Sequence, residues 1–132
     1  MESILEIKNL SKNYTGFNLE NISFNIDKGY IMGFIGPNGA GKTTTIKLIM
    51  NLIKRNSGEI KVVGLDNIRN EKEIKGRIGF VYDESNYYDN LSVKDNAKLI
   101  SDFYEKWSWT EFDRFLNIFG LDKKQKIKEL SK

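Results

Sequence analysis

The residue types with the most specific chemistry lie in one glycine-rich stretch, residues 36–44. This stretch matches the phosphate-loop pattern GxxxxGK[ST], with Lys42 and Thr43 in its last two fixed positions. Glycines let consecutive backbone N–H groups converge on a phosphate, and a lysine ammonium supplies a charge for the β- and γ-phosphates. A threonine hydroxyl at this point can ligate Mg²⁺. The expected nucleotide-binding residues are Gly36, Pro37, Asn38, Gly39, Ala40, Gly41, Lys42, Thr43 and Thr44.

The composition limits what other chemistry the chain can perform. Its 132 residues include no histidine and no cysteine. Disulfides, Cys/His zinc sites, cysteine nucleophiles and histidine acid–base catalysis are therefore excluded within these residues. A metal bound here must be a hard cation held by oxygen ligands, as Mg²⁺ is. The length suits one hydrophobic core, and 39% hydrophobic with 30% charged residues is typical of a soluble globular protein.

The net charge does not indicate a nucleic-acid partner, and the lengths of the apolar stretches do not indicate a membrane-spanning helix. A formal net charge of +3 is small, and the lysines crowding the last ten residues are expected to form a solvated helix face. No apolar stretch reaches the roughly 18 residues that a membrane-spanning helix needs. Residues 1–10 mix charged with apolar side chains, which differs from a signal peptide.

A phosphate loop must follow a strand and precede a helix, and the sequence predicts both. Residues 31–35 are apolar on both faces, which predicts a strand buried within a parallel sheet. The apolar residues of 42–53 predict a buried helix. A second buried strand is expected at 78–81, after a helical turn around 70–76. Alternating apolar and polar residues predict further strands at 5–8, 22–26 and 60–62, the first two joined by a turn at 12–16.

From residue 92 onward the pattern is helical. Val93, Ala97, Ile100 and Tyr104 fall on one helical face, with Ser92 and Asp95 as the expected capping pair. A second helix is expected to begin at Ser108, with Glu111 three residues on, and to end at Gly120.

The order of these motifs resembles the ATP-binding domain of an ABC transporter. The phosphate loop reads GPNGAGKTT, and the residues before it, LEIKNLSKNYTGFNLENISFNIDKGYIMGFIG, are similar to the opening strands of that family. The later segments SGEIKVVGLD and RIGFVYDESNYYDNLSVKDNAKL resemble its next strand and turn and its Q-loop region. The resemblance implies an α/β P-loop NTPase fold with N-terminal antiparallel strands and a helical subdomain. Residues 1–91 would form the nucleotide-binding core, and residues 92–132 would begin the helical subdomain.

The resemblance also assigns roles to two residues outside the phosphate loop. Tyr14 stands at the position of the family's adenine-stacking aromatic, although an aromatic in a turn is more often an ordinary packing residue. Asp83 stands where the family has a glutamine that ligates the metal, so Asp83 joins Thr43 as an expected Mg²⁺ ligand. A one-residue slip of the alignment would move this role to Glu84. A carboxylate here would add negative charge beside the γ-phosphate.

The last residues resemble the opening of the family's signature motif. Leu130 and Ser131 match its first two positions, so the rest of the signature motif, the Walker B strand, the catalytic glutamate and the switch histidine would lie beyond residue 132. The resemblance therefore implies that these residues are the N-terminal part of an ATPase that drives transport, with Lys42 as the catalytic residue present. Its partners would be a transmembrane permease and a second ATP-binding subunit, and it would lie in the cytoplasm on the inner face of the membrane. The 132 residues alone are expected to be nearly inactive and to self-associate through exposed apolar surface.

Three alternatives stay open at this point. A P-loop kinase of small molecules would need lid arginines, and the four arginines of this chain are not clustered. A non-transport ABC ATPase acting on ribosomes or DNA would show salt-dependent binding to nucleic acid. A structural or regulatory nucleotide-binding module would bind without turnover. The transported substrate and the direction of transport cannot be read from these residues.

Overall fold

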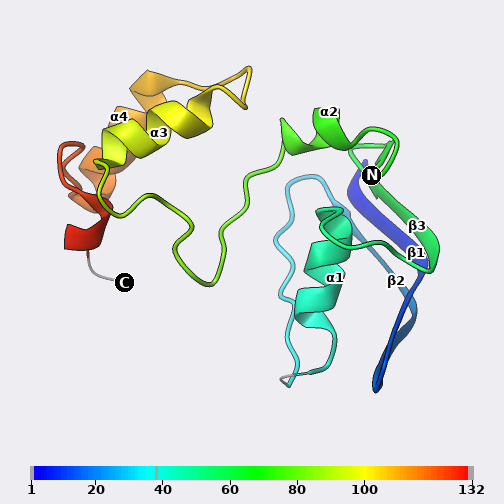
Figure 1. The fold of residues 1–132 in the computed structure, drawn as a ribbon. Coiled ribbons are helices and arrows are strands. Elements are labelled where there is room, and N and C mark those ends of the chain that lie inside the picture. Colours follow the sequence, from blue (N-terminus) through cyan, green and yellow to red (C-terminus); the bar gives the residue numbers. More distant parts are fainter. Residues whose placement is uncertain (1, 38, 131–132) are drawn as a thin grey trace. The chain divides into compact units, whose positions relative to one another are not determined.

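The computed structural model describes residues 2–37 and 39–130 and divides the chain into two compact units, Met1–Lys75 and Gly76–Lys132. The predicted functional boundary at 91/92 is a different division and stays a prediction. Figure 1 labels the elements, which are β1 (Ser3–Tyr14), β2 (Phe17–Asp27), α1 (Lys42–Ile49), β3 (Ser57–Val62), β4 (Leu65–Asp66), α2 (Glu71–Lys75), α3 (Val93–Ser101), α4 (Trp109–Phe119) and the 3₁₀ helix η1 (Ile127–Glu129).

The first unit is built on a four-stranded antiparallel sheet with the order β2-β1-β3-β4. β1 and β2 form a hairpin whose register runs from Ser3 opposite Asp27 to Tyr14 opposite Phe17. The predicted hairpin is confirmed, and its strands are longer than the alternation at 5–8 and 22–26 indicated. The strands continue through most of the expected turn region, which leaves a two-residue turn after Tyr14.

The core of this unit joins the sheet to two helices. Ile7, Leu10 and Ile60 from the sheet are almost completely buried, as is Leu48 of α1. The remaining buried apolar side chains are Leu19, Val62 and Ile74. Burial of this kind contributes about 1.5–3 kcal/mol for each large apolar side chain, which stabilises the sheet and α1 as one unit.

Gly58 fixes the pairing of β3 with β1. A Cβ atom at this position would lie 2.4 Å from the carbonyl oxygen of Asn9, and the φ of +95° belongs to the left-handed region. The register between β1 and β3 shifts here, between Lys8 and Ser11. Glycine is therefore required at this close approach of the two backbones.

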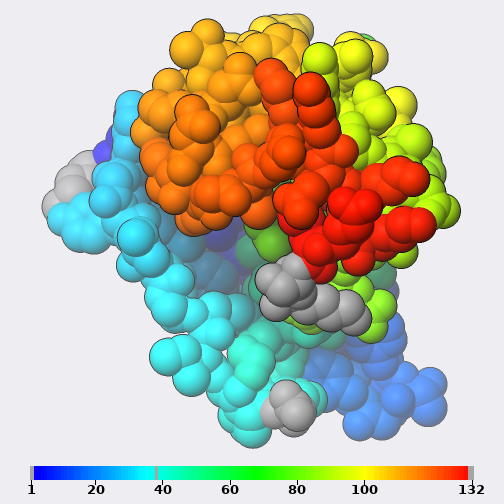
Figure 2. Space-filling view, turned by 90° about the vertical axis from the view of Figure 1, so that its left-hand side faces the viewer, coloured from blue at the N-terminus to red at the C-terminus, as the bar shows by residue number. Residues whose placement is uncertain are grey.

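The two predicted buried parallel strands are not formed, and these predictions are wrong for the structure. Residues 31–35 and 78–81 have no strand pairing, and Ile31, Ile35 and Val81 are 101%, 95% and 88% exposed. The light-blue to cyan segment before α1 lies at the molecular surface in Figure 2. A parallel strand needs hydrogen-bonding neighbours, and no strand of the described ranges pairs with either segment.

The helix after the phosphate loop is shorter and less buried than expected. α1 ends at Ile49 rather than at residue 53, and Asn51 follows in the left-handed conformation with a φ of 54°. Leu48 is buried, but Ile46 and Leu52 are 37% and 48% exposed. The apolar run therefore covers more than the one helical face that packs on the sheet.

The second unit confirms the predicted helix caps. The Ser92 hydroxyl accepts a hydrogen bond from the backbone N–H of Asp95 at 3.0 Å, and the Ser108 hydroxyl accepts one from Glu111 at 3.2 Å. Gly120 ends α4 with a φ of 65°. α3 stops before Tyr104, whose hydroxyl donates to the carbonyl oxygen of Ile78 at 3.0 Å.

The lysine-rich end differs from the predicted helix face. Lys123 and Lys124 are exposed but lie in a turn, and the described residues after them contain only the short η1. Ser131 and Lys132 lie outside the described residues. None of the helices in the described ranges has the length and apolarity that a membrane span requires.

Candidate nucleotide site

The phosphate loop enters α1 through Gly41, which is the N-cap of the helix with a φ of 98°. Both the backbone N–H and the hydroxyl of Thr45 donate to the Gly41 carbonyl oxygen, at 2.9 and 2.8 Å. Thr45 is 1% exposed, so this double contact is shielded from water. The first turn of α1 is thereby fixed with its free N–H groups and positive dipole end facing the loop, as an anion site requires.

Close packing against β2 holds the loop in place. A Cβ atom at Gly41 would lie 2.8 Å from Leu19 Cδ1 and 3.2 Å from Phe17 Cζ. Leu19 is a buried core residue, so it has little freedom to move away. Gly41 is therefore needed both for its positive φ and for this close approach, which ties the loop to the hairpin.

Lys42 turns back onto the loop that precedes it. Its Nζ donates to the carbonyl oxygen of Gly36 and lies 3.4 Å from the carbonyl oxygen of Pro37. An ammonium group has three N–H donors, so these two contacts leave one for a phosphate oxygen. The charge thus lies within the loop, between its first residues and α1.

The loop, the start of α1 and β2 line an open pocket with a volume of about 420 Å³. This volume falls in the range of about 300–1,000 Å³ that is typical of small-molecule sites. Its described lining residues are Phe17, Gly39, Gly41, Lys42, Thr43 and Thr44. Five of the nine predicted loop residues therefore line one pocket. Gly36 and Pro37 contact Lys42, Ala40 donates its N–H to Pro37 at 3.2 Å, and Asn38 lies outside the described residues.

The structure places Tyr14 at the end of β1, outside the lining of this pocket. Its side chain is 43% exposed, and the Lys12 ammonium lies 5.2 Å from the centre of its ring. Its partner across the hairpin is Phe17, which does line the pocket. Phe17 was not among the predicted site residues. The two-residue turn after Tyr14 is the signal that could have found it, because the turn sets these two residues opposite each other.

The expected metal ligands belong to different units. Thr43 lines the pocket in the first unit, and its hydroxyl is the type of ligand that Mg²⁺ shares with phosphate oxygens. Asp83 and Glu84 lie in an exposed irregular segment of the second unit. In the described ranges, no group of three or more acidic residues forms a metal site by itself. The metal roles of Thr43 and Asp83 remain predictions.

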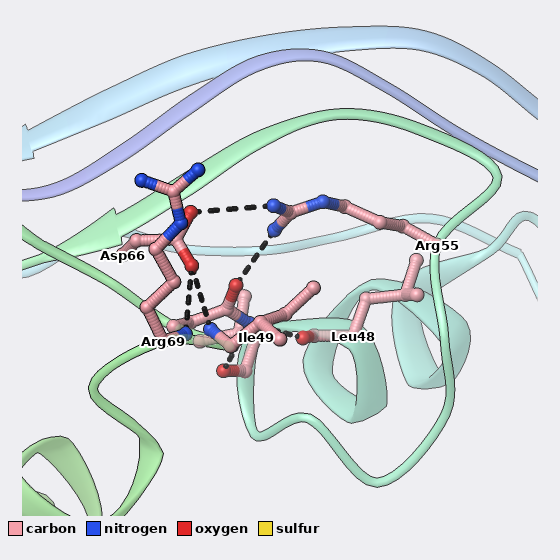
Figure 3. A network of polar contacts seen from close by, with 7 residues as sticks. Leu48, Ile49, Arg55, Asp66 and Arg69 are labelled. Carbon is pink, nitrogen blue, oxygen red and sulfur yellow. Dashed lines mark hydrogen bonds and ion pairs between the residues drawn. The ribbon is translucent and has the colours of Figure 1, made fainter.

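A polar network supports the far end of α1 (Figure 3). The buried Asn67 side chain donates to the carbonyl oxygens of Leu48 and Ile49, at 2.8 and 3.1 Å. Its own oxygen accepts from Arg55 Nη1 at 2.7 Å, and Arg55 Nη2 reaches the Asp66 carboxylate at 3.3 Å. At the end of α1 these contacts add to the hydrogen bond that the Asn51 N–H donates to Leu48, and they join α1 to the β3–β4 hairpin.

The Asp66 carboxylate is held in its charged form. The backbone N–H groups of Arg69 and Ile68 donate to it at 2.9 and 3.0 Å. The Arg69 N–H is the largest cause that lowers the pKa of Asp66 below its ordinary value of 3.8, followed by the Ile68 N–H and the Arg55 guanidinium. The charge therefore persists through the neutral pH range and keeps the network intact.

Comparison with known proteins identifies strong relatives. A family model described as ABC transporter matches residues 19–132. A bacitracin transport ATP-binding protein of Bacillus licheniformis is 35% identical over 127 residues, covering 96% of this chain and 42% of that protein. A phosphonates import ATP-binding protein of Fusobacterium nucleatum is 39% identical, covering 88% of this chain and 52% of that protein. The chain thus spans about half the length of these relatives.

Solved structures agree with the sequence relatives. A structure described as an ATP binding subunit of an ABC transporter is 30% identical, with a TM-score of 0.86, covering 98% of this chain and 56% of that one. A putative ABC transporter ATP-binding protein from Pyrococcus furiosus is 37% identical, with a TM-score of 0.79, covering 96% and 62%. The fold of these residues is therefore similar to that of the matching parts of these two chains.

Proposed function

This chain belongs to the ABC transporter family of ATP-binding proteins, and we propose that it binds ATP with Mg²⁺ through residues 36–44. The observation that carries the proposal is the pocket at the start of α1, where Lys42 and Thr43 lie beside the glycine backbone. A cation, a hydroxyl and free helical N–H groups together complement a polyphosphate and its metal ion.

Each residue has a separate part in this proposal. The loop backbone and the start of α1 bind phosphate oxygens, and Lys42 supplies positive charge for the β- and γ-phosphates. The Thr43 hydroxyl holds Mg²⁺, which when bound neutralises phosphate charge during phosphoryl transfer. Tyr14 stacks on the adenine ring. Asp83, or Glu84 in its place, takes the role of the family's Q-loop glutamine.

For the whole protein we propose coupling of ATP hydrolysis to transport across a membrane. Two of the relatives, a bacitracin transport protein and a phosphonates import protein, support a transport role. A second ATP-binding subunit and a transmembrane permease are the expected partners, and the inner face of the cell membrane is the expected location. These two relatives differ in their cargo, so no substrate is proposed for this chain.

A polypeptide of residues 1–132 alone is expected to bind ATP far better than it hydrolyses it. Phosphoryl transfer depends on several groups positioned together, and these residues include no histidine to serve as the switch residue of the family. Such a polypeptide is also expected to self-associate, since Ile31, Ile35 and Val81 are almost fully exposed.

Calorimetric titration of Mg²⁺ and ATP into the protein and its Lys42→Ala variant tests the binding proposal. Hydrogen bonds to charged groups contribute about 1.5–3 kcal/mol, so the variant should bind ATP roughly tenfold to a hundredfold more weakly. Lys47→Ala is the matched control, because Lys47 is exposed on the same helix and does not line the pocket. Equal affinity of the Lys42→Ala variant and the unchanged protein would contradict the proposal. In the same assay, an Asp83→Asn variant with unchanged Mg²⁺-dependent affinity would remove Asp83 from the site.

A further inference from the structure

The pocket has one wall that the phosphate-loop motif does not supply. Phe17, the first residue of β2, lines it together with five residues of the loop and α1. Its side chain is partly buried, so part of the ring remains accessible. A hydrocarbon ring cannot form hydrogen bonds with phosphate oxygens. We therefore look for an apolar contact that this side of the pocket could make.

The hairpin fixes where this ring lies. Phe17 pairs with Tyr14 across the two-residue turn, and side chains of directly paired residues lie on the same face of a sheet. The ring Cζ would lie 3.2 Å from a Cβ at Gly41, so the ring lies over the backbone that leads into Lys42. Tyr14 itself does not line the pocket, and its ring lies near the Lys12 ammonium. Of the two aromatics, Phe17 is the one next to the loop.

We propose that Phe17 is a contact residue for the nucleoside part of the nucleotide, packing its ring against the base or ribose beside the phosphate loop. The inference rests on the proposed ATP binding and adds a residue that determines how the nucleoside is held. Every base has a π face, and base–aromatic stacking needs no particular hydrogen-bond pattern. Phe17 therefore acts on the nucleoside while Lys42 and Thr43 act on the phosphates and Mg²⁺.

A purely structural role for Phe17 makes a different prediction. If the ring only supported Gly41, its removal would disturb the loop and weaken every ligand that binds there. Inorganic tripolyphosphate separates the two roles, since it carries three linked phosphates and no nucleoside. Its affinity reports the loop, and the ATP affinity reports the loop together with the nucleoside contact.

Calorimetric titration of the protein with Mg²⁺ and either ATP or tripolyphosphate tests the proposal. Phe17→Ala should weaken ATP binding roughly fivefold to a hundredfold, as loss of one aromatic stacking partner does, and change tripolyphosphate affinity less than about twofold. Phe17→Tyr keeps the ring face and should bind ATP nearly as well as the unchanged protein. Phe103→Ala is the control, because Phe103 is 78% exposed and lies in the second unit.

Two results would overturn the proposal. Equal weakening of both ligands by Phe17→Ala would show that the ring only supports the loop, and unchanged ATP affinity would show that it makes no contact with the nucleoside. The Lys42→Ala variant tests the proposed phosphate site independently of Phe17, because it should weaken the binding of ATP and of tripolyphosphate alike. Failure of the unchanged protein to bind either ligand would refute the nucleotide site itself, and the role of Phe17 with it.

Discussion

Strand β3 and residues 31–35 are both short segments that contain isoleucine, yet these isoleucines lie in opposite environments. Ile60 of β3 is completely buried, whereas Ile35 is 95% exposed. Ile60 pairs with Ile7 in the antiparallel sheet, and β3 has a strand on each side. Residues 31–35 have no such neighbour in the described ranges. The contrast shows that apolar residues favour burial, but that a strand forms only where a neighbouring strand pairs with its backbone.

Truncation of Ile60 should have the largest effect on stability. Ile60→Ala removes a completely buried side chain, on a residue paired with Ile7, and leaves a cavity in the core of the first unit, which typically costs about 2–5 kcal/mol. The free energy of unfolding, measured by urea titration with circular dichroism, should fall by this amount. A loss below about 1 kcal/mol would mean that the sheet is not packed as described.

The matched control for this variant is Ile35→Ala. Since Ile35 is almost fully exposed, this change should alter the free energy of unfolding by no more than about 0.5 kcal/mol. Light scattering should show less self-association, because an exposed apolar side chain has been removed. Equal destabilisation by Ile35→Ala and Ile60→Ala would remove the contrast between the two regions.

Asn67→Ala should have an intermediate effect. It would remove the hydrogen bonds that the Asn67 side chain makes with the carbonyl oxygens of Leu48 and Ile49 and with Arg55, and of these carbonyls Leu48 would keep the bond from the Asn51 N–H. Unsatisfied buried polar groups cost about 1–3 kcal/mol, and thermal unfolding would measure the loss. Asn18→Ala, at an exposed position of β2, is the control and should be close to neutral. A neutral Asn67→Ala variant would show that α1 does not depend on this network.

The smallest expected effect is a pH dependence due to Asp66. Its pKa is lower in the folded protein than in the unfolded chain, so its charged form stabilises the fold above the unfolded value of about 3.8. This stabilisation is lost as the pH falls through the lower, folded value. Asp66→Asn should therefore flatten the decline in the free energy of unfolding between about pH 5 and pH 3.

A second variant isolates this contribution. Glu71 also has a lowered pKa, because Lys75 bonds to its carboxylate, and it acts in the same direction. Glu71→Gln should leave unchanged the contribution of Asp66 to the pH dependence of the free energy of unfolding. If Asp66→Asn reproduces the full pH dependence of the unchanged protein, the Arg69 N–H and the Arg55 guanidinium do not stabilise that carboxylate.

Local signals predicted the parts of the fold that depend on nearby residues. Ser92 and Ser108 cap the first turns of α3 and α4, and Gly120 ends α4, as expected. Such caps could be predicted because they are formed by residues within one helical turn. The hairpin was predicted for the same reason. The buried strand predicted at residues 31–35 is wrong. The sequence pattern shows that these residues favour burial, but it does not show which strand would pair with them.

In the candidate site, too, the parts formed by neighbouring residues were predicted and the parts formed by distant residues were not. The phosphate loop was predicted from adjacent residues, and five of them line one pocket. Phe17 could not be found without the hairpin register, and the Arg55–Asn67 contact joins residues on either side of β3. Side-chain contacts of this kind depend on how strands and helices pack, which a motif does not contain.

The pairing of β1 with β3 depends on closing a long stretch of chain that contains the phosphate loop and α1. β1 and β2 meet through a two-residue turn, so their hairpin forms from local contacts. β3 reaches β1 only when the intervening chain, with the whole phosphate loop and α1, closes on itself. Loop closure costs entropy before the new contacts compensate for it, which slows non-local pairing. During synthesis, a ribosome-bound chain is therefore expected to form the hairpin first, and β3 can join the sheet only after Ser57–Val62 has emerged.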